Sequence, residues 1–249
     1  MLLKIISKNI VEWKAILQTI SEIVDEAMFI CNQDGITFRG IDPSHVSLLD
    51  ITIPKSSFES YECHSTFFGV KVEDFKNIIS IASNDDVLEI IIENPNKVNI
   101  RIHGSLDMKY DLGLIERSEV NLPIPKVESR SKISLSPSIL SKIISSIEKI
   151  SDYITINSIS NQIQFIGNGD VGKAMINLDR NNQELSQLDV REDTSAIYSL
   201  EYMAKIIRDI GRTSTIVNME YGTKTPIRMV FEMPSATKVE YYLAPRVED

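Results

Sequence analysis

The chain has 249 residues, of which 43% are hydrophobic and 24% are charged, so we expect a folded protein with a substantial core. Its 35 acidic residues outnumber its 26 basic ones, and the net charge of −9 argues against a protein coated with nucleic acid, although it leaves room for a local basic patch. The two cysteines and three histidines form no CxxC or HExxH spacing, so we expect no zinc site and no cofactor.

Four segments of the chain carry an apolar residue every three or four positions, which predicts helices with one buried face. These segments are residues 9–24, 72–82, 136–150 and 199–210. In the third of them, Ser136 is a good N-cap residue and Pro137 follows at the first helical position. The helix starts recur at steps of about 60–65 residues, which indicates four copies of one structural unit.

Strand-like runs follow each predicted helix. The runs directly after the helices are residues 27–31, 86–92, 152–157 and 213–219, and further alternating runs are residues 35–41, 46–53, 98–104, 162–167, 173–178 and 227–233. Each copy is therefore a helix followed by several short, mostly antiparallel strands, so the fold class is α+β. A solenoid of helical repeats is disfavoured, because each unit is too long and too rich in strands.

The pattern lapses between the second and third copies, at the stretch NLPIPKVESRSKIS. Pro123 and Pro125 predict an extended linker here, because proline and the residue before it disfavour helix. The chain then divides into two similar domains, 1–117 and 133–249, joined by a connecting loop at 118–132.

Residues 167–173, GNGDVGK, match the G-x-G-x-x-G pattern of dinucleotide-binding proteins, and Asp189 lies near where a ribose-binding acid would sit. That fingerprint needs a helix directly after the glycines, whereas the next helical pattern begins only near residue 198. The other interpretation is a glycine-rich turn with positive φ between two antiparallel strands, the second of which starts at Lys173. A nucleotide-dependent oxidoreductase built on this stretch is the alternative function.

The helix faces opposite the apolar stripes carry several lysines and arginines. A single helix of this kind is usually a solvated surface helix. If four equivalent helices line the same side of a continuous outer sheet, however, their cations gather on one surface, which suits a phosphate backbone without base readout. No aromatic residues are interleaved with these cations, so stacking on single-stranded bases is not expected.

Several long motifs resemble one known family. GITFRGIDPSHVSLLDITIP followed by FESYEC, the stretch LPIPKV and the ending YYLAPRVED are similar to the sliding clamp family, the proliferating cell nuclear antigen of archaea and eukaryotes. The resemblance covers essentially the whole chain, and the short acidic end suggests the archaeal branch. It implies two domains of duplicated βαβββ units, and three chains joined head to tail in a ring. Sheets would form the outside of this ring, and four helices would line a hole for duplex DNA.

The resemblance also implies three sets of site residues. The candidates for contact with DNA are Lys14, Lys76, Lys142, Lys205, Arg208 and Arg212. The two ring-forming edges would run through Met108, Lys109, Tyr110 and Asp111 and through Lys173, Ala174, Met175 and Ile176. A pocket for a partner motif with a glutamine, an aliphatic residue and two aromatic residues would involve Ile41, His45, Leu122, Ile124, Pro226, Tyr242, Ala244, Pro245 and Arg246. Where more basic members carry cations, this chain has Ser21, Asn77, Ser80 and Ser145, so the strength of its DNA contacts is open.

The implied function is a processivity factor without enzymatic activity. Its partners would be double-stranded DNA, DNA polymerase, flap endonuclease, DNA ligase and a clamp loader. The ring would contain identical or paralogous chains, and a clamp-like subunit of a checkpoint or mixed ring is a further hypothesis. No stretch approaches the roughly 20 apolar residues of a membrane span, and the N-terminal apolar run is too short for a signal peptide. We therefore expect a cytoplasmic, nucleoid-associated protein.

Overall fold

The structure is a computed structural model, and it describes residues 2–116 and 122–247. The chain divides into two compact units. Unit 1 comprises Met1–Pro43, Leu49–Leu122 and Met233–Val239, and unit 2 comprises Ser44–Leu48, Pro123–Glu232 and Glu240–Asp249. Each half of the sequence therefore contributes one short segment to the unit built by the other half.

Unit 1 contains two helices and two groups of antiparallel strands. In chain order its elements are β1 (Leu3–Ser7), α1 (Ile10–Ser21), β2 (Glu26–Asn32), β3 (Gly35–Ile41), β4 (Ser47–Pro54), the 3-10 helix η1 (Lys55–Ser57), β5 (Ser60–Cys63), β6 (Thr66–Lys71), α2 (Val72–Ser80), β7 (Val87–Asn94), β8 (Lys97–His103) and β9 (Met108–Gly113). One sheet has the order β5-β1-β7-β8-β9, and the other strands are ordered β4-β3-β2-β6.

Unit 2 repeats this plan. Its elements are β10 (Ser131–Leu135), α3 (Pro137–Ile147), β11 (Tyr153–Ile159), β12 (Gln162–Gly169), β13 (Gly172–Asp179), β14 (Leu185–Val190), β15 (Thr194–Ser199), α4 (Leu200–Asp209), η2 (Ile210–Arg212), β16 (Ile216–Tyr221), β17 (Ile227–Glu232) and β18 (Lys238–Leu243). One sheet has the order β13-β12-β11-β15, and the other strands are ordered β14-β10-β16-β17-β18.

Four copies of one β-α-β-β-β unit account for most of these elements, which confirms the predicted α+β fold. The copies begin at β1, β6, β10 and β15. The four predicted helices are all present, and each ends one to three residues before the end of its predicted segment. The pattern of apolar residues did not show the strand before each helix, which only the family resemblance implied, because this strand is five or six residues long and merges with the start of the helical pattern.

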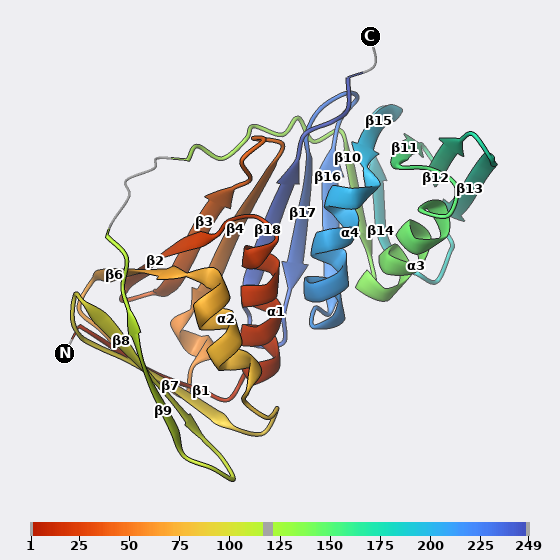
Figure 1. Cartoon of the computed structure of the whole chain (residues 1–249). Coiled ribbons are helices and arrows are strands. Elements are labelled where there is room, and N and C mark those ends of the chain that lie inside the picture. The colour runs from red at the N-terminus through yellow and green to blue at the C-terminus, as the bar shows by residue number, and fades with distance from the viewer. Residues whose placement is uncertain (1, 117–121, 248–249) are drawn as a thin grey trace. The chain divides into compact units, whose positions relative to one another are not determined.

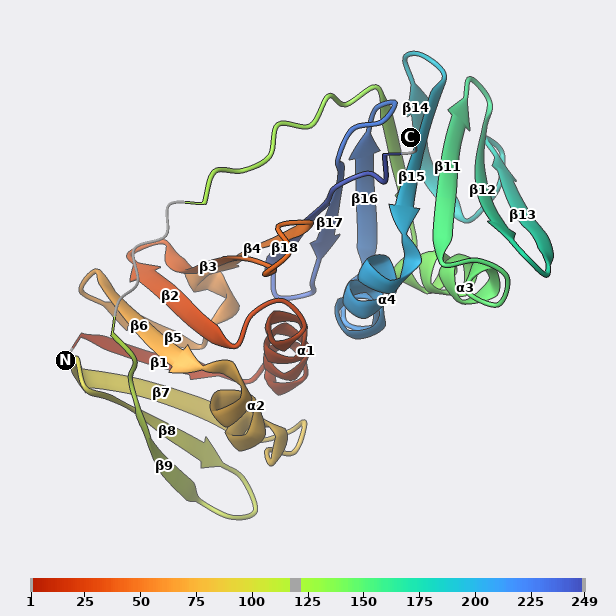
Figure 2. The same cartoon turned by 45° about the horizontal axis from the view of Figure 1, so that its top comes forward.

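The apolar stripes of the helices form the core of each unit. In unit 1, α1 and α2 lie side by side against the strands, and the rings of Trp13 and Phe75 are 6.2 Å apart (Figures 1 and 2). In unit 2, α3 and α4 pack in the same way, with Leu140 and Met203 fully buried. The apolar residues that recur every three or four positions in the sequence thus form the buried side of each helix. Within the described ranges, no helix has the length and apolar character that crossing a membrane would require.

A buried polar cluster explains why the segment Met233–Val239 belongs to unit 1. The carboxylate of Glu12 on α1 accepts hydrogen bonds from the backbone N–H of Ser235, at 3.2 Å, and from the Ser235 hydroxyl. The Ser57 hydroxyl donates to the Ser235 carbonyl oxygen at 2.6 Å. Because Glu12 is only 8% exposed, these bonds compensate for its burial and hold the turn before β18 against α1.

The glycine-rich stretch is a hairpin between β12 and β13, in which Gly169 pairs with Gly172. Lys173 lies in β13 and Asp189 in β14, so no helix opens after the glycines. This geometry contradicts the dinucleotide fingerprint, because no helix N-terminus faces a phosphate site. The turn prediction holds, with one correction: only Gly172 has the positive φ that was expected, at 148°.

The other two glycines allow close packing against the end of α3. A Cβ atom at Gly169 would lie 1.8 Å from the carbonyl oxygen of Ile150, and one at Gly167 would lie 2.3 Å from Cγ2 of Ile147. We therefore expect Gly169→Ala to reduce the free energy of unfolding by about 1–3 kcal/mol, as overpacking does. Gly113→Ala in edge strand β9 is the control, because no atom of the described residues lies within 4 Å of its added Cβ. Thermal melts followed by circular dichroism measure both variants, and equal melting temperatures would contradict the packing argument.

Candidate DNA-facing and partner-binding surfaces

In unit 1, the two predicted DNA-facing lysines are bound to neighbouring groups. The Lys14 ammonium donates to the carbonyl oxygen of Ala82 at 2.5 Å, just beyond the C-terminal end of α2, where the helix dipole favours a cation. The Lys76 ammonium lies 2.7 Å from the Glu73 carboxylate and 3.4 Å from the Ser21 hydroxyl. Both lysines are half-buried. Their positive charge is therefore partly compensated within unit 1.

In unit 2, the exposed helix faces carry less compensated charge. Lys142 on α3, Arg208 on α4 and Arg212 in η2 are exposed, and Lys142 and Arg208 form no ion pair with any residue that the structure describes. Lys205 is half-buried, lies 3.0 Å from the Glu201 carboxylate and has its ammonium 5.7 Å from the centre of the Tyr202 ring. The strongest candidates for phosphate contact are thus Lys142 and Arg208.

Both predicted ring-forming strands lie at a free edge of their sheets. In β9, at the edge of the five-stranded sheet of unit 1, Lys109 and Asp111 are exposed and Met108 and Tyr110 are half-buried. The hydrogen bond from Lys97, at 2.9 Å, is the main cause that lowers the pKa of Asp111. Edge strands leave one row of backbone N–H and C=O groups available for pairing with another strand.

The strand β13 is the corresponding edge in unit 2. Lys173 and Met175 are exposed, and Ala174 and Ile176 are half-buried. The Met175 side chain is 47% exposed, which leaves its apolar surface available for contact.

Seven residues of the predicted peptide pocket, including Ile124, belong to unit 2. Those in the C-terminal segment are held by backbone hydrogen bonds. The Ala244 N–H donates to the carbonyl oxygen of Val46 at 2.9 Å, and the Arg246 N–H donates to that of Ile197 at 2.7 Å. The guanidinium of Arg246 also stacks 3.8 Å above the ring of Tyr153. His45 and Ile124 are exposed, whereas Pro226, Ala244 and Pro245 are half-buried.

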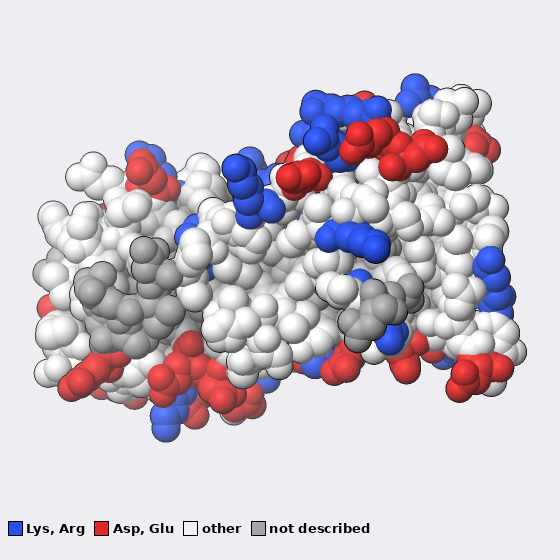
Figure 3. Space-filling model, turned by 90° about the horizontal axis from the view of Figure 1, so that it is seen from above, with Lys and Arg blue, Asp and Glu red and all other residues white. Residues whose placement is uncertain are grey.

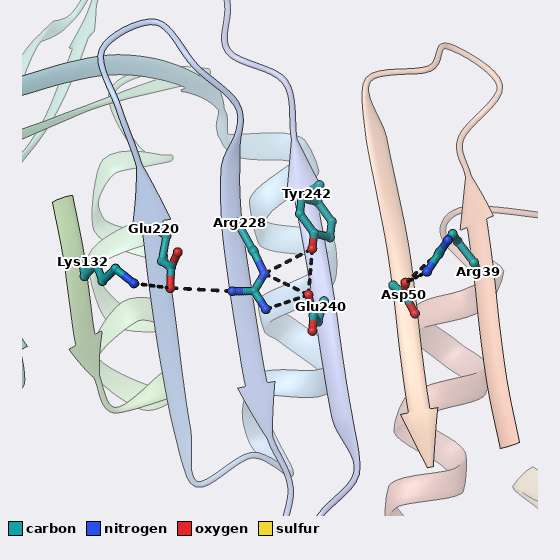
Figure 4. Close-up of polar contacts among 7 residues, drawn as sticks. All are labelled: Arg39, Asp50, Lys132, Glu220, Arg228, Glu240 and Tyr242. Atoms are coloured by element: carbon teal, nitrogen blue, oxygen red, sulfur yellow. Dashed lines mark hydrogen bonds and ion pairs between the residues drawn. The ribbon is translucent and has the colours of Figure 1, made fainter. Parts of the chain in front are cut away.

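Tyr242 is the most buried member of the predicted pocket, and a charge network holds its hydroxyl group (Figure 4). That hydroxyl donates to the Glu240 carboxylate at 2.7 Å and accepts from Nε of Arg228 at 3.2 Å. Burial raises the pKa of Tyr242 to about 12, so the hydroxyl stays protonated at neutral pH and remains a donor. The ring therefore has a fixed orientation in β18.

This network continues across the strands of unit 2 and was missed in the sequence. Arg228 also lies 3.6 Å from Glu220, which lies 3.2 Å from Lys132 (Figure 4). The hydrogen bond to Glu240 is the main cause that raises the pKa of Arg228 above its ordinary range. The signal available in the sequence was the presence of charged residues among the apolar ones in β16, β17 and β18, but only the pairing of the strands shows which charges meet.

Ile41 and Leu122, the remaining pocket residues, belong to unit 1. Ile41 is half-buried at the end of β3. The Leu122 carbonyl oxygen accepts a hydrogen bond from Nη1 of Arg39 at 3.0 Å, and Arg39 in turn is paired with Asp50 on β4 (Figure 4). Neither Arg39 nor Asp50 was in the predicted site.

Among the described residues, no group of three or more His, Cys, Asp or Glu side chains could hold a metal ion. The face seen in Figure 3 has wide areas without charged side chains, and acidic and basic side chains lie both within it and along its edges. The negative net charge is therefore not gathered in one patch on this face.

Comparison with known families accounts for both halves of the chain. Residues 3–113 match the N-terminal domain of proliferating cell nuclear antigen, and residues 123–246 match its C-terminal domain. The chain belongs to the proliferating cell nuclear antigen family. Family membership confirms the resemblance and the clamp fold, and it gives the oxidoreductase alternative no support.

Individual relatives agree with this assignment. The DNA polymerase sliding clamp of Nitrosopumilus maritimus is 39% identical over 236 residues, which cover 94% of each chain. A structure of the C-terminal region of FEN-1 bound to A. fulgidus PCNA matches with a TM-score of 0.90 and 27% identity, and covers all of both chains. A PCNA2–PCNA3 complex from Sulfolobus tokodaii matches with a TM-score of 0.89 and 26% identity over 98% of this chain and 100% of the matched chain. The names of these relatives describe a clamp and not an enzyme.

Proposed function

We propose that this chain is one subunit of a ring-shaped DNA polymerase sliding clamp that encircles duplex DNA. The observation that carries the proposal is the match of both halves to the two domains of proliferating cell nuclear antigen, on a fold with four copies of one β-α-β-β-β unit. Processivity then comes from topology: a closed ring stays on the duplex even when each contact with phosphate is weak. Weak, sequence-independent contacts also let the ring slide.

We propose that the cations on the helices face the DNA. Lys142 and Arg208 are the main contributors, because their charges are exposed and uncompensated, while Lys14, Lys76 and Lys205 have neighbouring partners and Arg212 lies at the end of this face. So few uncompensated cations in each subunit predict a weak contact with a modest dependence on salt. The acidic remainder of the surface, at a net charge of −9 per chain, would discourage binding of DNA elsewhere.

The ring requires the edges β9 and β13 of neighbouring subunits to pair, as a head-to-tail interface that closes. Both strands are free edges in the isolated chain, which supports this pairing. The Sulfolobus tokodaii complex shows that in that organism PCNA2 and PCNA3 associate. For this chain we propose either three identical subunits or a mixture with paralogues. Sedimentation of the pure chain distinguishes them, because a complete homotrimer has three times the 28.1 kDa of one chain.

Met175→Asp tests this interface. We expect it to shift the assembly towards monomers, because a carboxylate would be placed in a contact that must exclude water. Ser186→Asp, at an exposed position of β14 in the same unit, is the matched control and should leave the mass unchanged. Sedimentation equilibrium at micromolar concentration measures both. An unchanged mass for Met175→Asp, together with a trimeric wild type, would show that β13 is not at the interface.

We further propose that the pocket set predicted from the sequence receives partner peptides. In A. fulgidus, PCNA binds the C-terminal region of FEN-1, which supports a peptide site in the family. By analogy, the partners of this chain would be DNA polymerase, flap endonuclease and DNA ligase, with a clamp loader to open the ring. Among the proposed pocket residues, Ile124 is an exposed apolar side chain, which suits the apolar anchors of such peptides. A clamp acts where the DNA is, so we place the chain in the cytoplasm with the nucleoid.

Primer extension tests the function as a whole. Purified chain, clamp loader and polymerase are mixed on a primed circular template, and product lengths are compared with and without the chain. We expect longer products for each binding event of the polymerase when the chain is present, because the ring keeps the polymerase on its template. Products of equal length with a correctly assembled ring would overturn the proposal.

A further inference from the structure

Arg39 connects a rigid sheet face to the segment that links the two halves of the chain. Its Nη1 donates to the backbone carbonyl oxygen of Leu122 at 3.0 Å, across 83 residues of sequence. We propose that Arg39, fixed by Asp50, is a positioning residue that holds the connecting segment at Leu122 and so shapes the peptide-binding surface. The inference rests on the peptide-binding part of the proposed function.

The orientation of Arg39 is determined by Asp50. Both Nε, at 2.7 Å, and Nη2 of Arg39 donate to the same carboxylate oxygen of Asp50 (Figure 4). The Asp50 side chain projects from β4 and is only 13% exposed, against 37% for Arg39, so the pair is partly shielded from water. A planar guanidinium with two nitrogens engaged on one side leaves its remaining nitrogen in a fixed direction, which the compact ammonium of lysine does not reproduce.

The connecting segment needs such an anchor because its own backbone forms few hydrogen bonds that could hold it in place. Residues 122–127 form no helix or strand in the described chain, and Pro123 and Pro125 have no N–H to donate. Extended chain of this kind is held by contacts made to its carbonyl groups or its side chains. Arg39 supplies a charged donor to a carbonyl at the start of this stretch, and a charged donor makes a stronger hydrogen bond than a neutral one.

The anchor acts next to a predicted pocket residue. Arg39 and Ile41 are two positions apart in β3, so they lie on the same face of the strand, about 6–7 Å apart along it. The hydrogen bond thereby keeps Leu122, another predicted pocket residue, over the face that carries Ile41. Holding a binding surface in place before the ligand arrives lowers the ordering entropy that binding must offset.

Two measurements on the assembled wild type and Arg39→Ala test the proposal. Hydrogen–deuterium exchange of fragments that cover residues 122–129 reports the anchor, and calorimetric titration with a synthetic peptide containing glutamine, an aliphatic residue and two aromatics reports the site. We expect faster exchange and about three- to tenfold weaker binding in Arg39→Ala, the range that the net contribution of one typical hydrogen bond gives. Arg39→Lys should not restore either property, and Asp50→Asn should reproduce part of both effects.

Thr52→Ala is the matched control, because Thr52 is exposed two positions from Asp50 on the same face of β4. It should match the wild type in both measurements, and thermal melts confirm that each variant is folded. Unchanged exchange in Arg39→Ala, or faster exchange with equal or tighter binding, would overturn the positioning role. In either case normal peptide binding by the wild type would leave the proposed function standing. If the assembled wild type binds no peptide at all, the proposed peptide site itself is wrong, whatever the exchange shows.

Discussion

Reversing two charges on the helix faces, Lys142→Glu together with Arg208→Glu, is expected to shorten the products of clamp-dependent synthesis about tenfold or more. Each change removes a proposed phosphate contact and introduces a repulsive carboxylate, and losing one such contact lowers the slope of binding against salt by about one. Primer extension at several salt concentrations measures the product length and its salt dependence. Both side chains are exposed, so folding and ring mass should be unchanged.

The control for this variant has the same change in net charge at positions outside α1, α2, α3 and α4. Lys55→Glu with Lys224→Glu alters two exposed lysines, one in η1 and one in the turn after β16, and should leave product length near that of the wild type. An equal loss in the control would show that net charge, not the helix face, governs the effect. Full-length products from the Lys142 and Arg208 double variant would remove these two residues from the DNA-facing surface.

The second large effect is expected for Tyr242→Ala, with partner-peptide affinity about ten- to hundredfold weaker, since tyrosine is enriched among the hot spots of binding interfaces. The ring of Tyr242 is 4% exposed and is oriented by Glu240 and Arg228, so its removal takes away a preformed wall of the proposed pocket. Calorimetric titration of the same synthetic peptide measures the affinity. Unchanged affinity in a folded variant would show that the pocket lies elsewhere.

Tyr242→Phe separates the ring from its hydroxyl. Phenylalanine keeps the wall but loses the bonds to Glu240 and Arg228, so we expect nearly normal affinity and a stability loss of about 0.5–1.5 kcal/mol. Removing the whole ring leaves a cavity and should cost about 3–5 kcal/mol. Titrations therefore need a temperature well below the melting point of Tyr242→Ala. Strong loss of affinity in both variants would assign the effect to the hydroxyl group.

Much of the fold was predictable because a helix or strand with one buried face has apolar residues at a regular spacing in the sequence. The four helices and most of the strands after them were found from that period alone, and Pro123 and Pro125 marked the connecting segment. The glycine stretch was assigned to a hairpin because no helical pattern follows it. The reason for two of its glycines was not visible, since Gly169 is required by the carbonyl of Ile150, which the tertiary fold brings against β12.

The amino-acid sequence by itself determined which residues are helical, which helix face carries cations, and to which family the chain was expected to belong. Two of the charge partners lie one turn away on the same helix, Glu73 for Lys76 and Glu201 for Lys205, so their spacing in the sequence could indicate them. Only the tertiary structure decided the state of the other cations. Lys14 is engaged by a carbonyl group 68 residues away, whereas Lys142 and Arg208 face solvent. The tertiary structure alone also revealed the hydrogen bond from Arg39 to Leu122 and the charge network from Lys132 to Glu240. Helical periodicity is local and can be read along the chain, but a hydrogen bond or ion pair between distant segments depends on which segments the fold brings together, and no local pattern encodes that.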